Sequence, residues 1–318
     1  MISILMPVKN AAPYLEECLE SIQQQTHANW ELIAIDDQSD DNSIEILNQY
    51  AKLDSRIHWE KNKDKGIIPA LRQAFSLSKG QFISRMDADD KMPKDKLEQF
   101  LLMMDEKVVV SGKVQYFSEG EVSEGYKRYE QWLNGLQDLD HWKHIYRECT
   151  VASPNWMVHR QFFETEFEWE KWKYPEDYDM LFHWCKAGYF IKKCSSITHF
   201  WREHPQRTSR NNDRYQQASF FDLKTNWFVD LEIDKTEEIQ LIGSGIKAKR
   251  VEEVFKKREI LFTSYAFKEK SGYQSIYDLN PAKKAILTNW PVDEHTQNEI
   301  QLFLEARGFE FGNNLWLF

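Results

Sequence analysis

Three aspartates fall within four residues of this chain, at Asp87, Asp89 and Asp90, directly after an apolar-leaning run that we expect to end a β-strand. Carboxylates crowded at the tip of a strand repel one another unless a cation lies between them. A divalent metal ion meets this need, because Mg²⁺ typically shares one or two carboxylates with the phosphates of a substrate. The alternative is an ordinary polar turn in which Asp90 caps a helix over residues 95–104.

Two further acidic pairs stand where they could do chemistry. Asp36 and Asp37 close a predicted strand, and Glu176 and Asp177 open a predicted helix. A carboxylate at a helix N-terminus is stabilised in its ionised form and is suited to take a proton from a hydroxyl group. Either pair could instead form only a turn or a capping cluster, so both interpretations stay open.

Apolar runs and segments of helical spacing alternate through the first hundred residues, and these elements would position the acidic groups. We expect strands over residues 2–8, 30–35, 57–59 and 82–83, and helices over 14–22, 43–53 and 68–77. This alternation indicates a doubly wound α/β sheet. Ligands bind such sheets beyond the carboxyl ends of the strands, which is where Asp37 and Asp87 are placed.

The alternation is less regular after residue 105. Here we expect strands over 108–114 and 189–193, helices over 130–147, 178–187 and 216–229, and a basic loop over 203–213. In that loop, guanidinium and hydroxyl groups of Arg202, Arg207 and Ser209 could contact phosphate oxygens.

A second domain is predicted over residues 235–318, after a first domain over 1–230. It has strands near 239–242 and 285–288, a helix over 299–306, and the segment Gly243-Ser244-Gly245-Ile246-Lys247-Ala248. The segment fits the start of a dinucleotide-binding fingerprint, but no acidic residue follows at the expected distance. The glycines would also serve close packing of a strand and a helix. We therefore expect a small Rossmann-like α/β domain of unknown role.

Composition restricts the class of protein. The 318 residues carry a formal net charge of −10, which argues against nucleic acid as a partner. The sequence shows neither a membrane-spanning run nor a signal peptide, and its four cysteines lack disulfide or zinc spacing. These features predict a cytoplasmic protein. Peripheral contact with the inner face of the membrane and the oligomeric state are left open.

Five segments in this order and spacing resemble glycosyltransferase family 2, whose members have the GT-A fold: residues 3–10, 35–41, 80–90, 174–179 and 201–204. The resemblance covers about residues 1–225. It implies a GT-A type Rossmann-like doubly wound sheet, a nucleotide-sugar donor, and a Mn²⁺ or Mg²⁺ ion on the donor diphosphate. It also implies transfer of a sugar to a hydroxyl group.

The resemblance also implies roles for single residues. Asp89 would ligate the metal, Asp87 would reach the ribose or the metal, and His204 would be a further ligand, although a lone histidine is more often structural. Asp37 would accept the N3–H of uracil. The expected contacts to the nucleotide-sugar are Pro7, Lys9, Asn10, Asp37, Lys65, Arg85, Asp87 and Arg202.

For the chemical step, the family's catalytic base matches Asp177, with Glu176 beside it, and Trp156 stands where relatives line the acceptor site. Together these features predict an inverting, metal-dependent hexosyl- or N-acetylhexosaminyl-transferase. It would use a UDP-sugar and a glycan or lipid-linked acceptor in surface polysaccharide synthesis. The alternatives are a nucleotidyltransferase and a non-catalytic glycan-binding module on a transferase-like fold. The first lacks a glycine-rich basic loop after the first strand, and the intact Asp87, Asp89 and Asp177 argue against the second.

Overall fold

The chain divides into two compact units in the computed structural model, which describes residues 1–207, 213–234, 236–266, 274–291 and 294–318. The first unit comprises Met1–Asp138, Val151–Trp172 and His183–Asn211. The second comprises Leu139–Thr150, Lys173–Phe182 and Asn212–Phe318. This division differs from the predicted boundary between residues 230 and 235, because the C-terminal part begins at Asn212 and two earlier segments group with it.

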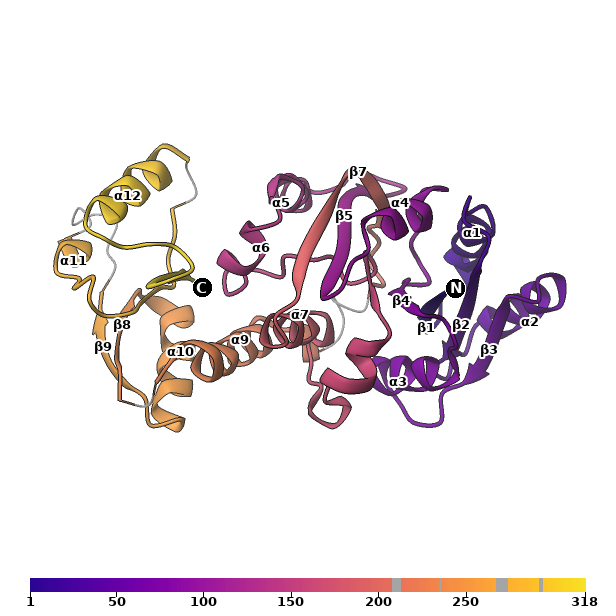
Figure 1. The fold of residues 1–318 in the computed structure, drawn as a ribbon, viewed down its shortest axis with the longest axis horizontal. Coiled ribbons are helices and arrows are strands. Elements are labelled where there is room, and N and C mark those ends of the chain that lie inside the picture. The colour runs from indigo at the N-terminus through magenta and orange to yellow at the C-terminus, as the bar shows by residue number, and fades with distance from the viewer. Residues whose placement is uncertain (208–212, 235, 267–273, 292–293) are drawn as a thin grey trace. The chain divides into compact units, whose positions relative to one another are not determined.

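A seven-stranded sheet forms the centre of the first unit, in the order β3-β2-β1-β4-β6-β5-β7 (Figure 1). All neighbouring strands are parallel except that β6 runs antiparallel to both β4 and β5. The strands are β1 (Ile2–Val8), β2 (Trp30–Asp36), β3 (Ile57–Lys61), β4 (Phe82–Arg85), β5 (Val108–Phe117), β6 (Trp156–His159) and β7 (Phe190–Arg202).

The first four strands are joined by amphipathic helices, as the sequence predicts: α1 (Ala12–Gln23), α2 (Ser43–Leu53) and α3 (Ile67–Leu77). In α1 the buried residues Leu15, Cys18, Leu19 and Ile22 recur at the spacing of one helix face. Strands β1 and β2 are buried almost throughout, which is typical of parallel strands covered on both sides. With right-handed connections, α1 and α2 cover one face of the sheet and α3 the other.

The register of the parallel strands aligns their carboxyl ends. Val8 of β1 pairs with Asp36 of β2, and Leu5 of β1 pairs with Arg85 of β4. The segments that follow these strands therefore leave the same edge of the sheet, next to one another. This edge carries Lys9, Asp37 and Asp87.

The remainder of the first unit completes the sheet with α4 (Lys96–Met103), α5 (Glu124–Gly135) and two short helical turns, Phe162–Glu166 and Trp169–Lys171. The single helix predicted over 130–147 is wrong, because α5 ends at Gly135 and a separate turn, α6 (Asp140–Lys143), follows. Between them Leu136 is buried, and the Asp138 carboxylate accepts a hydrogen bond from the Lys193 backbone. The strand predicted over 189–193 extends instead to Arg202.

The second unit contains a parallel four-stranded sheet in the order β11-β10-β8-β9. Its strands are β8 (Glu238–Ile242), β9 (Leu261–Tyr265), β10 (Ala285–Leu287) and β11 (Leu315–Leu317). Its helices are α6, which was described above, α7 (Glu176–Lys186), which continues into the first unit, α9 (Gln217–Glu232), α10 (Gly245–Lys257), α11 (Gln274–Tyr277) and α12 (Glu294–Ala306). A short turn at Asp213–Tyr215 precedes α9. The unit thus contains a parallel sheet and helices, so it is an α/β fold.

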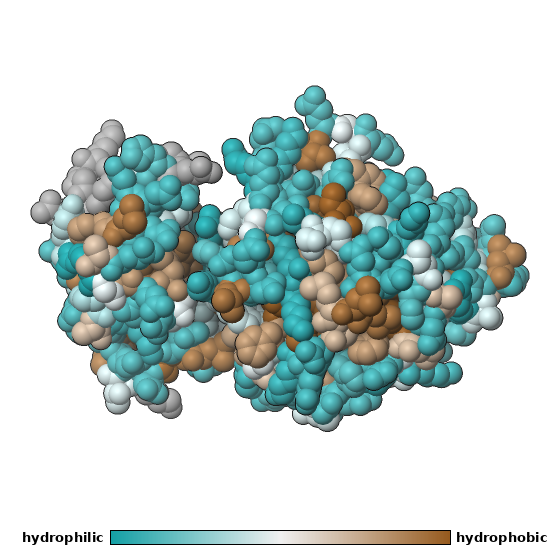
Figure 2. Space-filling model, turned by 45° about the horizontal axis from the view of Figure 1, so that its top comes forward, coloured by the Kyte–Doolittle hydropathy of each residue, from teal (hydrophilic) through white to brown (hydrophobic). Residues whose placement is uncertain are grey.

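The surface in Figure 2 is mostly hydrophilic, with separate hydrophobic patches. Among the described helices, none combines the length and the apolar character that crossing a membrane requires.

Candidate active site

Asp37 stands directly after β2, and its carboxylate is held from one side. Its Oδ1 accepts hydrogen bonds from Nδ2 of Asn62 at 2.7 Å and from the backbone N–H of Gly66 at 2.9 Å. Among the residues that the structure describes, its Oδ2 has no hydrogen-bond partner, and the side chain is only partly buried. The preceding Asp36 is fully buried and accepts from the backbone of Ser39. Asp36 thus closes the turn, while Asp37 presents one oxygen outward.

Lys9 and Asn10 shape the neighbouring loop after β1. The Lys9 ammonium group donates to the carbonyl oxygens of Asp37 at 2.8 Å and of Gln38 at 2.5 Å. Asn10 exchanges hydrogen bonds with the segment that follows β2, accepting from Asp40 and donating to Ser39. Both residues were predicted to contact the nucleotide, and in this structure both hold the Asp37 turn. Pro7 lies in β1 beside them, and Lys65 is exposed.

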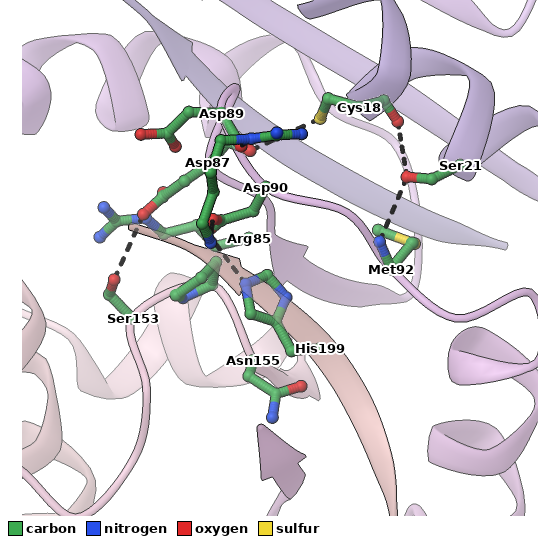
Figure 3. Close-up of polar contacts among 12 residues, drawn as sticks. Cys18, Ser21, Arg85, Asp87, Asp89, Asp90, Met92, Ser153, Asn155 and His199 are labelled. Carbon is green, nitrogen blue, oxygen red and sulfur yellow. Dashed lines mark hydrogen bonds and ion pairs between the residues drawn. The ribbon is translucent and has the colours of Figure 1, made fainter. Parts of the chain in front are cut away.

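Asp87 follows β4 and is anchored through both oxygens (Figure 3). Its Oδ1 accepts from Nε of the buried Arg85 at 2.8 Å, and its Oδ2 accepts from the Ser153 hydroxyl at 3.3 Å. Its backbone carbonyl faces the Cys18 thiol. Arg85 therefore orients the carboxylate next to it, a contact that the sequence motif alone does not show.

Asp89 and His204, which are both predicted to ligate a metal, lie in contact with each other. Nε2 of His204 lies 2.8 Å from Oδ2 of Asp89, and the imidazole ring packs against the Tyr14 ring at 4.5 Å between centroids. A carboxylate oxygen and an imidazole nitrogen are both donors that Mn²⁺ accepts. In the described part of the chain, no group of three or more His, Cys, Asp or Glu side chains is placed to hold a metal on its own. The pair fits a metal whose remaining ligands come from the substrate diphosphate.

Asp90 has a different environment from its two acidic neighbours, because it is fully buried. Its Oδ2 lies 2.9 Å from Nε2 of the equally buried His199, and its Oδ1 accepts from the Arg202 backbone (Figure 3). Burial, together with the charges of Asp89 and Asp87, raises the pKa of Asp90, and burial lowers the pKa of His199. Both directions favour an uncharged pair. Asp90 thus holds β7 against the loop that carries Asp87 and Asp89.

Lys96 is a further buried titratable group near the loop that carries Asp87 and Asp89. Its ammonium nitrogen donates to the Pro154 carbonyl at 2.8 Å, and the side chain is wholly inaccessible. Burial lowers the pKa of Lys96 to about 7, although the charges of Asp90 and Asp87 oppose that shift. Lys96 therefore links α4 to the segment that carries Ser153.

Arg202, which is predicted to contact a nucleotide-sugar, is surrounded by protein groups in this structure. Its guanidinium lies between the rings of Tyr14 and Phe117, at 4.8 and 4.4 Å from their centroids. It forms an ion pair with Glu17 and donates to the Asp89 carbonyl. The side chain is buried and supports the loop that carries Asp89, and its contact with a nucleotide-sugar stays a prediction. Arg207 pairs with Glu203 at 3.0 Å, and Ser209 lies outside the described residues.

Glu176 and Asp177 open α7, in the second unit, and their environments differ. Glu176 is buried and accepts from the Tyr215 hydroxyl at 2.5 Å. Asp177 is half-buried, and its Oδ1 accepts from the backbone of Tyr178 at 2.8 Å. The more accessible carboxylate is thus the one to which the resemblance gives the role of base.

Trp156 lies in the interior of the first unit. Its exposed fraction is 6%, its ring packs edge-on against Trp184, and its backbone carbonyl accepts from Ser84. The predicted contact with an acceptor has no support in this geometry. Asn62 and His199 are among the residues at the site that had not been singled out from the sequence. Side-chain alternation could not have placed His199 on the Asp90 side, because the pairing of β7 with β5 shifts register between Gly112 and Val114, and Thr198 and His199 are both buried.

The fingerprint-like segment after β8 has a packing role in this structure. Gly243 leaves no room for a side chain, since a Cβ atom there would lie 1.8 Å from the Thr288 hydroxyl. Gly245 has φ of +78°, a conformation that glycine adopts easily. Close packing of β8 against β10 accounts for Gly243, and the positive φ accounts for Gly245.

Comparison with known proteins agrees with this architecture. Residues 3–167 match the sequence model of the family described as "Glycosyl transferase family 2". The putative teichuronic acid biosynthesis glycosyltransferase TuaG of Bacillus subtilis is 39% identical over 110 residues. That alignment covers 34% of this chain and 43% of TuaG, so the match spans less than half of this relative's length.

Two solved structures have a similar fold. TarS residues 1–349 of S. aureus, in complex with UDP-GlcNAc, superpose with a TM-score of 0.56 and 16% identity, covering 73% of this chain and 68% of that chain. The mannosyltransferase PcManGT of Pyrobaculum calidifontis, in complex with GDP-Man and Mn²⁺, also gives a TM-score of 0.56, with 14% identity and coverage of 98% and 76%. At these identities the likeness concerns the fold, and it confirms the predicted GT-A type.

Proposed function

The chain belongs to glycosyl transferase family 2, and from this premise we propose that it is an inverting, metal-dependent glycosyltransferase that uses a UDP-sugar. The acceptor in this proposal is a hydroxyl group of a glycan or of a lipid-linked glycan, and the pathway is surface polysaccharide synthesis. The name of TuaG supports the pathway, and the UDP-GlcNAc complex of TarS supports the donor class.

One observation carries the proposal: the carboxyl ends of β1, β2 and β4 bring Asp37, Asp87 and the Asp89–His204 pair to one edge of the sheet. In this proposal, Oδ2 of Asp37 accepts the ring N–H of uracil, while Asp87, oriented by Arg85, lies toward the ribose. This edge is also where open α/β sheets bind their ligands.

Asp89 and His204 are the residues that would hold a Mn²⁺ or Mg²⁺ ion. When bound, such an ion offsets the negative charge that develops on the departing diphosphate. Asp177 is proposed as the base that takes the proton of the acceptor hydroxyl, since it is an accessible carboxylate in the first turn of α7. A single displacement without a protein nucleophile inverts the configuration at the anomeric carbon, as it does in inverting glycoside hydrolases.

The proposal is tested with a panel of UDP-, GDP-, CDP- and dTDP-sugars in the presence of Mn²⁺. Release of nucleoside diphosphate is measured with and without glycan acceptors, and donor binding is measured by calorimetry. We expect binding and turnover with UDP-sugars, both abolished in Asp89→Asn. Failure to bind any nucleotide-sugar would overturn the enzyme proposal, and pyrophosphate release from a nucleoside triphosphate would favour a nucleotidyltransferase.

A further inference from the structure

Asn62 lies at the end of β3 and is positioned to control the orientation of the Asp37 carboxylate. The side chain is 7% exposed, although it is polar and stands beside a loop. Buried amides of this kind are normally fully hydrogen-bonded, and Asn62 follows that rule. Nδ2 donates to Asp37 Oδ1 at 2.7 Å and to the Gly66 carbonyl at 3.1 Å, while Oδ1 accepts from the Asp64 backbone at 3.3 Å.

The hydrogen-bond network fixes which way the amide points. If the amide were flipped, its oxygen would face a carboxylate oxygen and a carbonyl oxygen, and both contacts would be repulsive. The backbone N–H of Asn62 also donates to the Asp36 carbonyl at 2.8 Å, so the residue is tied to the same turn through main chain and side chain.

Gly66 supplies the second donor to the same oxygen. Its φ of +110° is a conformation that side chains other than glycine rarely adopt, and it aims the N–H at Asp37 Oδ1 as α3 begins. From the other side, the Lys9 ammonium group holds the Asp37 carbonyl. The turn and one carboxylate oxygen are therefore fixed before any ligand binds.

We infer that Asn62 is a positioning residue for base recognition: it occupies Asp37 Oδ1, so that only Oδ2 faces the base. A single outward carboxylate oxygen accepts a ring N–H, as in uracil or thymine. It repels cytosine, whose N3 presents a lone pair instead of a hydrogen. The inference rests on the proposed function, because it assigns a role within the proposed UDP-sugar site. Without Asn62, the carboxylate rotates and loses this preference.

The test compares UDP with CDP, which carry the same ribose and diphosphate, so that any contribution of the metal cancels between them. Calorimetry with Mn²⁺ gives both dissociation constants for the wild type and for Asn62→Ala. We expect the affinity for UDP to fall by about tenfold or more, the loss typical of removing a hydrogen bond to a charged group. The affinity for CDP should change by less than about threefold.

Gln73→Ala is the matched control. Gln73 is also a buried amide; it accepts from the Lys63 backbone and donates to Glu60 and to the Lys61 carbonyl. It therefore holds the same connection between β3 and α3 without touching Asp37. We expect Gln73→Ala to alter both affinities by the same factor. Should Asn62→Ala fail to fold, the isosteric Asn62→Asp, which cannot donate to Asp37, replaces it and should show the same selective loss.

The outcomes separate the two proposals. If the wild type binds UDP and CDP equally, or neither, the proposed uracil site is wrong. If the wild type prefers UDP but Asn62→Ala keeps that preference, or loses it no more than Gln73→Ala does, the role of Asn62 is overturned. A loss confined to UDP in the Asn62 variants supports it.

Discussion

Nε2 of His204 lies 2.8 Å from Oδ2 of Asp89, across 115 residues of sequence. The contact depends on β7, whose end brings His204 over the loop that follows β4. Below it, Asp90 fastens the same strand through His199 and the Arg202 backbone. The three aspartates of one short motif thus have three separate environments: Asp87 against Arg85, Asp89 against His204, and Asp90 in the core.

Metal-dependent donor binding should depend on His204. We expect His204→Ala to weaken Mn²⁺-dependent UDP binding at least on the order of 10–100-fold, the range known for losing groups around a metal site. Titration of UDP at a series of Mn²⁺ concentrations measures the effect. His27→Ala is the control, since within the described part of the chain the His27 ring makes a hydrogen bond only with the Asn29 carbonyl. Equal binding by wild type and His204→Ala would show that the histidine is structural.

Asp177 should be needed for transfer and not for donor binding. We expect Asp177→Asn to lower kcat by roughly 10²–10⁴-fold, the usual contribution of a general base, with the donor dissociation constant unchanged. Glu176→Gln is the matched control, because Gln keeps an acceptor for the Tyr215 hydroxyl, and it should stay within a few-fold of wild type. If Glu176→Gln is the inactive variant instead, the base assignment belongs to Glu176.

Arg202 should act on stability more than on donor affinity. Arg202→Met removes the hydrogen bond to the Asp89 carbonyl and the ion pair with Glu17, and we expect a loss of about 2 kcal/mol in the free energy of unfolding. Glu17→Gln should cost less than about 1 kcal/mol, because Glu17 is more than half exposed. Denaturant unfolding measures both. A variant Arg202→Met that is fully stable yet cannot bind UDP would support the predicted contact with the nucleotide-sugar.

Lys96 should give the protein a pH-dependent stability. Burial lowers its pKa to about 7 in the folded chain, so between pH 7 and about 10.4 the unfolded chain binds more protons at this site than the folded chain. Stability at this site therefore rises with pH through that window and is lost as the pH falls toward 7, with a limiting slope of about 1.4 kcal/mol per pH unit.

The difference between wild type and Lys96→Met in denaturant unfolding isolates this slope from other titrations. Lys94→Met, at an exposed position on the same segment, should leave the pH profile unchanged. A constant difference between wild type and Lys96→Met from pH 7 to 10 would mean that Lys96 stays charged in the folded protein.

The sequence was sufficient to locate the individual segments that carry the site residues. Apolar runs located β1, β2 and β4, and since their carboxyl ends align in a parallel sheet, Asp37 and Asp87 could be placed together. The end of β7 was predicted nine residues too early, because polar residues such as Lys192, Lys193 and Ser196 interrupt the apolar pattern that defines a strand. The sequence therefore predicted only part of what this strand contributes to the site: His204 was expected near the metal, whereas His199 was not singled out.

Contacts between distant residues could not be predicted from single positions. Arg202 stands within a family motif, and its chemistry suits a phosphate as well as it suits Glu17, which lies 185 residues away. Asn62 carries no charge and no unusual spacing, so nothing in its surroundings marks it before Asp37 is known to face it. Trp156 has a residue type that suits sugar binding, and only its burial shows that the ring packs inside the protein.

The length of β7 also bears on exchanging parts between related enzymes. The region that matches the family ends at Phe167, before the strand that carries His199 and leads to His204. A hybrid that joins residues 3–167 of this chain to the remainder of a relative would combine Asp89 and Asp90 with histidine partners of foreign origin. Grafts that keep the chain intact through Arg207 preserve both pairs, so crossover points for recombination should be chosen beyond that residue.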